Sequence, residues 1–190
     1  MATSTTIEQK RGDVCPHQFA FMLDNWLRRL VQSPRKIVGE YINEGNTVLD
    51  VGCGPGYFTI DMAKMVGKSG KVIAADLQPQ MLEKVRKKAT KHNVLERLSF
   101  HRCEPGNIGL STNVDFILAF YMIHETGDPK GFLMEMKRML NPGGKLLIVE
   151  PKMHVSEELF KELVRDAENL GLKVVDYPKG KGGRSLLLTV

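Results

Sequence analysis

The feature that most constrains the fold is a regular alternation of short apolar runs and amphipathic stretches after residue 45. The apolar runs suit buried strands, and the stretches between them place apolar residues three and four positions apart, as one face of a helix requires. We expect strands at 47–51, 71–76, 98–101, 114–120, 146–150, 172–177 and 185–190. We expect helices at 57–66, 79–92, 128–140 and 156–170. This order predicts right-handed β–α–β units and a doubly wound α/β sheet.

The last two expected strands change the topology at one edge. The loop at 178–183 is short enough to join them as an antiparallel hairpin. We therefore expect seven strands, mostly parallel, with an antiparallel last strand. The 190 residues suit one domain. We divide the chain into a flexible tail (1–14), an N-terminal helical cap (15–44) and a core (45–190).

Composition excludes several classes of protein. The 27 Lys and Arg residues against 22 Asp and Glu give a net charge of +5, which suits an acidic ligand without demanding nucleic acid. The longest apolar run, 116–123, is far shorter than the roughly 20 residues of a membrane span. The polar stretch 1–13 lacks the apolar segment of a secretory signal, and the three cysteines are widely spaced. These observations predict a cytoplasmic protein with reduced thiols.

A glycine-rich loop follows the first expected strand. Gly52, Gly54 and Gly56 stand between that strand and the next helix, and without a Cβ they let a ligand approach the backbone. Asp76 ends the second strand. Ligands in open parallel sheets bind at the carboxyl ends of the strands, so an acid at this position is suited to both hydroxyls of an adenosine ribose.

Two residues argue against a dinucleotide in this loop. A nicotinamide-type fingerprint needs glycine at position 57, where this chain has Tyr57. Asp50, within the strand, would repel a pyrophosphate but suits a ligand that carries an ammonium group. The pattern therefore favours S-adenosylmethionine over a dinucleotide, and a dehydrogenase is disfavoured.

Five segments together resemble the class I S-adenosylmethionine-dependent methyltransferases. They are VLDVGCGPG, the acid in VIAADL, VDFILAFYMIHE, LNPGGKLLIVEP and the closing helix–strand–strand, and they cover 46–190. Each alone is weak, but together they stand in the family's order and spacing. The chain is most similar to the small-molecule branch that includes the ubiquinone and menaquinone biosynthesis methyltransferases. The resemblance implies a Rossmann-like methyltransferase fold, S-adenosylmethionine as cofactor with S-adenosylhomocysteine as product, and a small-molecule acceptor.

The resemblance also implies a set of cofactor-binding residues. The glycines would line the methionine part of the cofactor, Asp76 would bind the ribose hydroxyls, and Glu104 would accept a bond from the adenine amino group. In full, the implied cofactor-binding residues are Asp50, Gly52, Gly54, Gly56, Asp76, Leu77, Glu104, Ala119 and Phe120.

The chain departs from the family pattern in two places. Glu104 stands between Cys103 and Pro105, where the family has a Gly-Asp-Ala-like context. Proline has no N–H, so position 105 cannot donate to an adenine ring nitrogen. His124 is followed by Glu125, where the small-molecule branch often has a second histidine.

Three residues at the ends of expected strands are candidates for catalysis: His124, Tyr121 and Glu150. The ordinary pKa of histidine, about 6.5, suits a general base near neutrality. The alternative for His124 is a structural bond to a backbone carbonyl. Tyr121 suits a pocket wall better than an acid, and Glu150 either faces the substrate or caps the next loop. A base is needed only if the acceptor must lose a proton.

Other functions remain open from the sequence. One is methylation of RNA or protein, for which the basic run at 84–91 would bind phosphate; no aromatic residues interleave with it, so a solvated helix face is the simpler interpretation. Another is a non-catalytic S-adenosylmethionine-binding subunit. No metal site is expected, because Cys15 and His17 supply only two of the four ligands of a closed zinc site. The oligomeric state stays open, and a homodimer is compatible with the sequence.

The acceptor pocket has no large insertion to cover it. We therefore expect residues 11–44 to form its roof, which would leave a site open enough for a bulky or lipid-like acceptor. The aromatic residues expected to line it are Phe19, Phe21, Trp26 and Tyr121.

Overall fold

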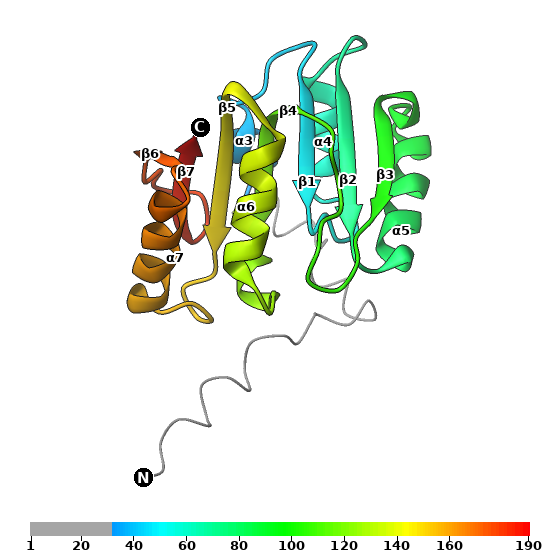
Figure 1. Ribbon diagram of the computed structural model, residues 1–190. Coiled ribbons are helices and arrows are strands. Elements are labelled where there is room, and N and C mark those ends of the chain that lie inside the picture. Colours follow the sequence, from blue (N-terminus) through cyan, green and yellow to red (C-terminus); the bar gives the residue numbers. More distant parts are fainter. Residues whose placement is uncertain (1–31) are drawn as a thin grey trace.

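The computed structural model describes residues 32–190, and in it seven strands form one sheet in the order β3-β2-β1-β4-β5-β7-β6 (Figure 1). The strands β1 to β5 pair in parallel, and β7 lies between β5 and β6, antiparallel to both. The expected sheet is confirmed, including its antiparallel last strand. Its strands are β1 Thr47–Val51, β2 Lys71–Asp76, β3 Leu98–Arg102, β4 Val114–Phe120, β5 Leu140–Glu150, β6 Lys173–Asp176 and β7 Arg184–Thr189.

Helices cover both faces of the sheet. In Figure 1, α6 and α7 lie on the near face, and α3, α4 and α5 lie behind the strands. This layering is the doubly wound arrangement that the alternation predicts. The helices are α3 Pro34–Val38, α4 Thr59–Met65, α5 Pro79–Lys91, α6 Pro129–Met139 and α7 Glu157–Asn169, with short 3-10 turns η3 Leu95–Arg97 and η4 Ile123–Glu125.

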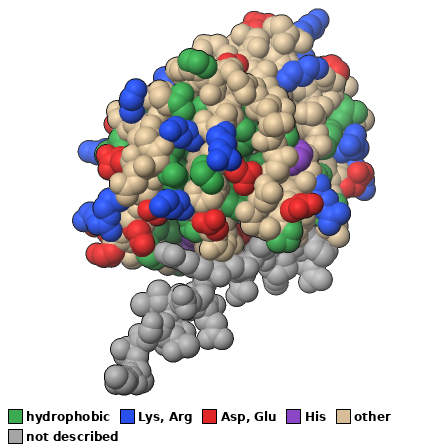
Figure 2. Space-filling model, viewed as in Figure 1, with side chains coloured by type: hydrophobic (Ala, Val, Ile, Leu, Met, Phe, Trp, Pro, Cys, Tyr) green, Lys and Arg blue, Asp and Glu red, His purple; other side chains and the backbone are tan. Residues whose placement is uncertain are grey.

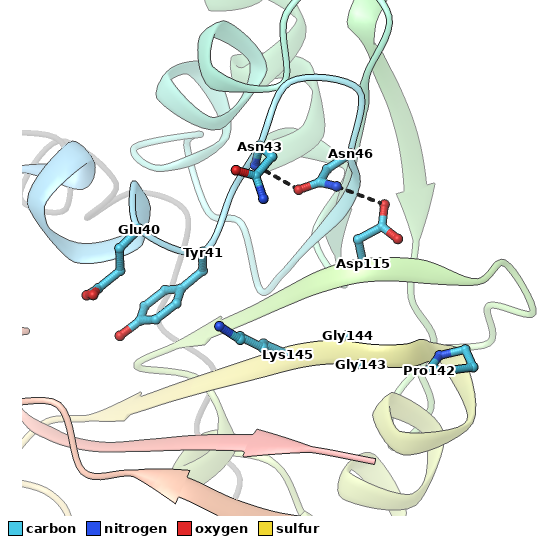
Figure 3. A pocket seen from close by; sticks show the side chains of 9 residues that line it. All are labelled: Glu40, Tyr41, Asn43, Asn46, Asp115, Pro142, Gly143, Gly144 and Lys145. Carbon is cyan, nitrogen blue, oxygen red and sulfur yellow. Dashed lines mark hydrogen bonds between the residues drawn. The ribbon is translucent and has the colours of Figure 1, made fainter.

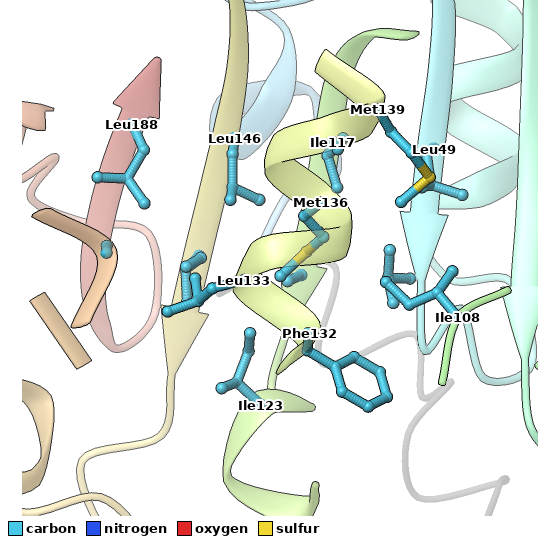
Figure 4. Packing of buried hydrophobic residues seen from close by; sticks show 14 of the residues in the cluster. Leu49, Ile108, Ile117, Ile123, Phe132, Leu133, Met136, Met139, Leu146 and Leu188 are labelled. Carbon is cyan, nitrogen blue, oxygen red and sulfur yellow. The ribbon is translucent and has the colours of Figure 1, made fainter. Parts of the chain in front are cut away.

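The two hydrophobic clusters explain why the strands are apolar almost throughout. Successive strand residues point to opposite faces, so Val48 packs with α3 and α4 while Leu49 packs beneath α6. Figure 4 shows the cluster beneath α6, in which Met136 and Leu133 of that helix lie over the sheet. Because both faces are covered, an alternating polar pattern would have placed polar side chains in one of the two cores.

Local sequence signals set the starts of two helices. The Asp128 carboxylate accepts a bond from the Gly131 N–H at 2.9 Å at the start of α6, and the Ser156 hydroxyl accepts one from the Leu159 N–H at 3.2 Å at the start of α7. Strand β5 differs from expectation. It begins at Leu140 rather than 146, because Leu140 pairs with Val114 before a shift in register.

A hollow of about 300 Å³ lies at the amino ends of β1, β4 and β5 (Figure 3). Its central acid, Asp115, accepts bonds from the Thr47 N–H at 2.8 Å and from Asn141 Nδ2 at 2.7 Å. These bonds join the starts of the three strands. The hollow is therefore a structural junction, at the opposite edge of the sheet from the glycine loop. Its lining residues are Glu40, Tyr41, Asn43, Asn46, Asp115, Pro142, Gly143, Gly144 and Lys145.

Candidate active site

The carboxyl ends of the parallel strands meet at one edge of the sheet, the lower edge in Figure 1. The glycine loop follows β1 there, Asp76 ends β2, Tyr121 follows β4 and Glu150 ends β5. The structure thus brings the expected cofactor loop and the expected catalytic residues to the same edge. This is the place where open α/β sheets bind ligands.

Each of the three loop glycines is required for a different physical reason. All three have positive φ angles: +66° at Gly52, +51° at Gly54 and +82° at Gly56. A Cβ on Gly52 would lie 2.9 Å from the Met122 Cβ, and one on Gly56 would lie 3.0 Å from a Val85 methyl carbon. A Cβ on Gly54 would meet nothing within 4 Å. Gly52 and Gly56 therefore admit neighbouring side chains, whereas Gly54 leaves open space where a ligand can approach the backbone.

Asp76 is held next to this loop by backbone donors. Its Oδ2 accepts the Gly54 N–H and its Oδ1 accepts the Gln78 N–H, both at 2.8 Å. Burial raises the pKa of Asp76, and these two bonds oppose part of that rise. Each oxygen keeps a further lone pair. The carboxylate can therefore accept further hydrogen bonds, and its role toward the two hydroxyls of a ribose stays a prediction.

The other expected cofactor residues lie in different surroundings. Leu77, directly after Asp76, is half-buried. Glu104 is exposed, and its backbone pairs with that of Asn107 in a tight turn, with N–O distances of 3.0 and 3.1 Å. Ala119 is fully buried and Phe120 nearly so, with the Phe120 ring packed 4.5 Å from that of Phe58. Their contacts with a cofactor stay predictions.

Asp50 points into the protein. Its carboxylate is buried and accepts a bond from the Thr59 hydroxyl at 2.6 Å, which connects β1 to the first turn of α4. Burial raises the pKa of Asp50 to about 7, although the Thr59 bond lowers it in part. Burial therefore opposes the negative charge that the predicted role of Asp50 needs. Its expected attraction for an ammonium group stays a prediction.

His124 and Glu150 form a hydrogen-bonded pair. The His124 Nδ1 lies 2.5 Å from Glu150 Oε2, and the Ile123 N–H donates to Glu150 Oε1 at 3.0 Å. The Glu150 side chain is 1% exposed and that of His124 17%. Both oxygens of the buried carboxylate therefore have N–H donors, and His124 is oriented with its other ring nitrogen away from Glu150.

The geometry of the pair is compatible with the predicted role of His124 as a general base. A neutral imidazole bound to a carboxylate through Nδ1–H has an unprotonated Nε2, which can accept a proton. Burial, the largest single influence, lowers the pKa of His124, but the bond and charge of Glu150, aided by the charge of Glu125, outweigh it and raise the pKa above its usual value. The expected alternative, a bond from His124 to a backbone carbonyl, is not the arrangement found, and Glu150 contacts His124 rather than capping the next loop.

The sequence reasoning missed a second histidine. His154, exposed in the loop after β5, has its Nδ1 3.4 Å from His124 Nε2, with the two rings roughly perpendicular. At 3.4 Å this is a weak contact that a substrate hydroxyl can replace. The sequence could have pointed to His154, because it lies four residues after Glu150, past the carboxyl end of the same strand.

Tyr121 connects two segments that are far apart in the sequence. Its hydroxyl donates to the Gly182 carbonyl at 2.6 Å and accepts a bond from Gln32 Nε2 at 2.9 Å. Its φ of +59° is uncommon for a residue with a side chain. Because the hydroxyl is engaged on both sides, the structure favours the expected role as a wall of the site over a role as an acid.

Replacing Tyr121 with phenylalanine removes both of these bonds. We expect the free energy of unfolding to fall by about 1–2 kcal/mol, since each net hydrogen bond contributes roughly 0.5–1.5 kcal/mol. Urea denaturation measures the change. Tyr177→Phe is the matched control, because Tyr177 is about half exposed. Equal stability of the two variants would show that the two hydrogen bonds of the Tyr121 hydroxyl contribute nothing to stability.

The basic run at 84–91 lies on α5 and is partly engaged within the protein. The Arg86 guanidinium lies 4.1 Å above the Phe100 ring, and Lys88 donates to the Pro55 carbonyl at 2.7 Å. On the face that carries α6 and α7, basic and acidic side chains are interspersed (Figure 2). Figure 2 shows no continuous basic surface on that face.

Several expectations fall outside residues 32–190, namely those on the tail, on Cys15 and His17, and on Phe19, Phe21 and Trp26. Within the described residues, no group of three or more His, Cys, Asp or Glu side chains is placed to hold a metal ion. No helix among them is long and apolar enough to cross a membrane. Cys53 and Cys103 are buried free thiols, and burial raises the pKa of Cys103 to about 12, so neither is suited to nucleophilic chemistry.

Comparison with known proteins gives matches to methyltransferases. A family model described as a methyltransferase domain matches residues 42–184. The ubiquinone/menaquinone biosynthesis C-methyltransferase of Salmonella arizonae is 31% identical over 121 residues, which are 63% of this chain and 48% of that protein. The chain thus spans about half the length of the curated relatives it matches.

Solved structures agree in fold. A SAM-dependent methyltransferase from Aquifex aeolicus superposes with a TM-score of 0.79 at 30% identity, covering 92% of this chain and 97% of that one. A TehB-like SAM-dependent methyltransferase from Corynebacterium glutamicum gives a TM-score of 0.69 at 17% identity, covering 92% and 99%. The second similarity concerns the fold alone.

Proposed function

The chain belongs to the S-adenosylmethionine-dependent methyltransferase family, and from that premise we propose that it transfers a methyl group to a small-molecule acceptor that loses a proton. The observation that carries the proposal is the Glu150–His124 pair at the carboxyl edge of the sheet. The turn that holds this pair packs on the glycine loop, since Met122 fills the space beside Gly52. A base and a cofactor loop are therefore neighbours.

The residues of the loop fit the cofactor. Gly54 faces open space, and the Asp76 carboxylate has lone pairs suited to a ribose. When bound, S-adenosylmethionine supplies an electrophilic methyl group on a sulfonium. In this site Asp76 would hold the ribose and the glycine loop the methionine part. Much of the rate enhancement would then come from alignment of the acceptor with the methyl group.

The protein's chemical contribution is to remove the acceptor's proton. His124 Nε2 would accept that proton, and Glu150 would stabilise the imidazolium through the Nδ1–H bond. His154 contacts the same Nε2 weakly and would give way to the acceptor. A positioned base matters only for an acceptor whose nucleophile sheds a proton, such as a hydroxyl or an acidic C–H group.

The relatives support a small acceptor. The Salmonella protein is named as a C-methyltransferase of ubiquinone and menaquinone biosynthesis, and a phenol-like ring with an acidic proton suits the base described here. Action in the cytoplasm, without a nucleic-acid partner, is part of this proposal.

The proposal is tested by incubating the purified protein with S-adenosylmethionine labelled in its methyl group. Parallel reactions contain a panel of phenols and hydroxylated quinone precursors, total RNA, or a protein extract. We expect label in one or more small molecules, with transfer that depends on His124. Label only in RNA, suppressed by reversing the charges of Lys84 and Lys87, would contradict the proposal. Binding of S-adenosylhomocysteine with no methylation of any fraction would favour a non-catalytic subunit.

A further inference from the structure

Lys88 of α5 contacts the glycine loop although it lies in a run of basic residues. Its Nζ donates to the carbonyl of Pro55 at 2.7 Å, and its side chain is half-buried. Its neighbours Lys87 and Lys91 on the same helix are exposed. The basic run therefore contains one member whose ammonium group is directed at the backbone of the expected cofactor site.

The loop is held by several hydrogen bonds. The Cys53 N–H donates to the Ala75 carbonyl at 3.0 Å, the Gly54 N–H to Asp76, and the Gly56 N–H to the Cys53 carbonyl at 3.1 Å. Lys88 adds its bond to the Pro55 carbonyl. A peptide unit is planar with its C=O and N–H on opposite sides. Holding the Pro55 carbonyl toward α5 therefore directs the following N–H, that of Gly56, into the loop.

The same helix connects both halves of the site. It begins at Pro79, shortly after Asp76, whose Oδ1 accepts the N–H of Gln78, the residue that precedes the helix. Three residues before Lys88, Val85 packs against Gly56, where a Cβ would lie 3.0 Å from a Val85 methyl carbon. Residues three apart lie on one face of a helix. One face of α5 thus supports the loop by packing at Val85 and by a charged hydrogen bond at Lys88.

We propose that Lys88 is a positioning residue for the cofactor: by holding the Pro55–Gly56 peptide, it keeps the glycine loop in the shape that receives the methionine part of S-adenosylmethionine. The inference rests on the proposed function, since it assumes that this cofactor occupies the loop. Lys88 acts through the backbone and requires no contact with the ligand. Its loss should affect the methionine end of the site more than the adenosine end.

The test is calorimetric titration with two probes that differ at the methionine end. S-adenosylhomocysteine carries the amino-acid group, whereas 5′-methylthioadenosine lacks it. For Lys88→Met we expect the dissociation constant of S-adenosylhomocysteine to rise about tenfold, because the charge-assisted bond to Pro55 no longer holds the loop that receives the amino-acid group. That of methylthioadenosine should change less than about twofold. Lys88→Arg keeps a donor and should restore most of the affinity. Lys87→Met and Lys91→Met should bind both probes like the parent.

The outcomes separate this inference from the proposed function. If the parent binds S-adenosylhomocysteine and Lys88→Met binds it equally well, the positioning role is wrong and the proposed function stands. An equal loss for both probes, with a lowered melting temperature, would also overturn it, because Lys88 would then support the fold in general. If the parent binds neither probe, the cofactor assignment itself fails, and this inference with it.

Discussion

Replacing Asp76 with alanine is expected to raise the dissociation constant for S-adenosylhomocysteine at least about 100-fold. Hydrogen bonds to a charged group contribute roughly 1.5–3 kcal/mol each, and a ribose offers two hydroxyls. A 100-fold change corresponds to about 2.8 kcal/mol, so the loss of both bonds accounts for it. The variant also releases the N–H groups of Gly54 and Gln78, which now have this carboxylate as acceptor.

The asparagine variant makes this prediction sharper. Both oxygens of Asp76 accept backbone N–H groups, so an amide at this position must turn its NH₂ toward one of them. We therefore expect Asp76→Asn to lose nearly as much affinity as Asp76→Ala. Glu104→Gln, at the exposed turn, should change the dissociation constant only a few-fold. Calorimetry with S-adenosylhomocysteine, and with NAD as a ligand expected not to bind, measures all three. An Asp76→Ala protein that binds within threefold of the parent would exclude the ribose role.

Replacing Glu150 with glutamine is expected to lower kcat by about 10²- to 10⁴-fold, the range of general acid–base catalysis. The two oxygens of Glu150 accept from the Ile123 N–H and from His124 Nδ1. Glutamine has one oxygen, so if that oxygen keeps the buried backbone donor, its NH₂ faces Nδ1. The imidazole then carries its proton on Nε2, which can no longer accept one from the acceptor.

The pH profile gives the same pair a second test. The neutral form of His124 is the base, so activity should rise as the pH increases through its raised pKa. Removing the Glu150 charge lowers that pKa, so the acid limb of the profile should move to lower pH while its plateau falls. The pair also stabilises the fold below the unfolded pKa of histidine, and this contribution disappears as the pH rises through the folded pKa. Ring NMR titration of His124 reports the shift without an acceptor.

Glu125→Gln is the matched control for Glu150→Gln. It removes the same charge close to His124, but Glu125 acts on the pKa of that residue by its charge alone. We expect a small shift in the pKa of His124 and a kcat close to that of the parent. Affinity for S-adenosylhomocysteine should be unchanged in both variants, which shows that they are folded. Equal kcat values for the two variants would remove the pair from the mechanism.

Features encoded within a few neighbouring residues could be predicted from the sequence. The short apolar runs predicted β2 and β4 with their observed bounds, because strands that are buried on both faces are apolar almost throughout. The glycine loop and Asp76 were located because a parallel sheet places the ends of its strands at one edge. The start of β5 could not be predicted in this way. The strand begins at Leu140 because that residue pairs with Val114 of β4, and not because of a pattern within the segment itself.

What the sequence by itself determined is the order of strands and helices, the edge at which a ligand is expected and the kind of ligand that the glycine loop favours. What only the tertiary structure decided is which distant side chains meet at that edge. Glu150 lies 26 residues from His124, Lys88 lies 33 from Pro55, and Tyr121 lies 89 from Gln32. The spacing of residues along the chain specifies neighbours only within a helix turn or a strand. Contacts between elements depend on how packing aligns their ends, and these contacts separate a histidine that could have been structural from one suited to take a proton.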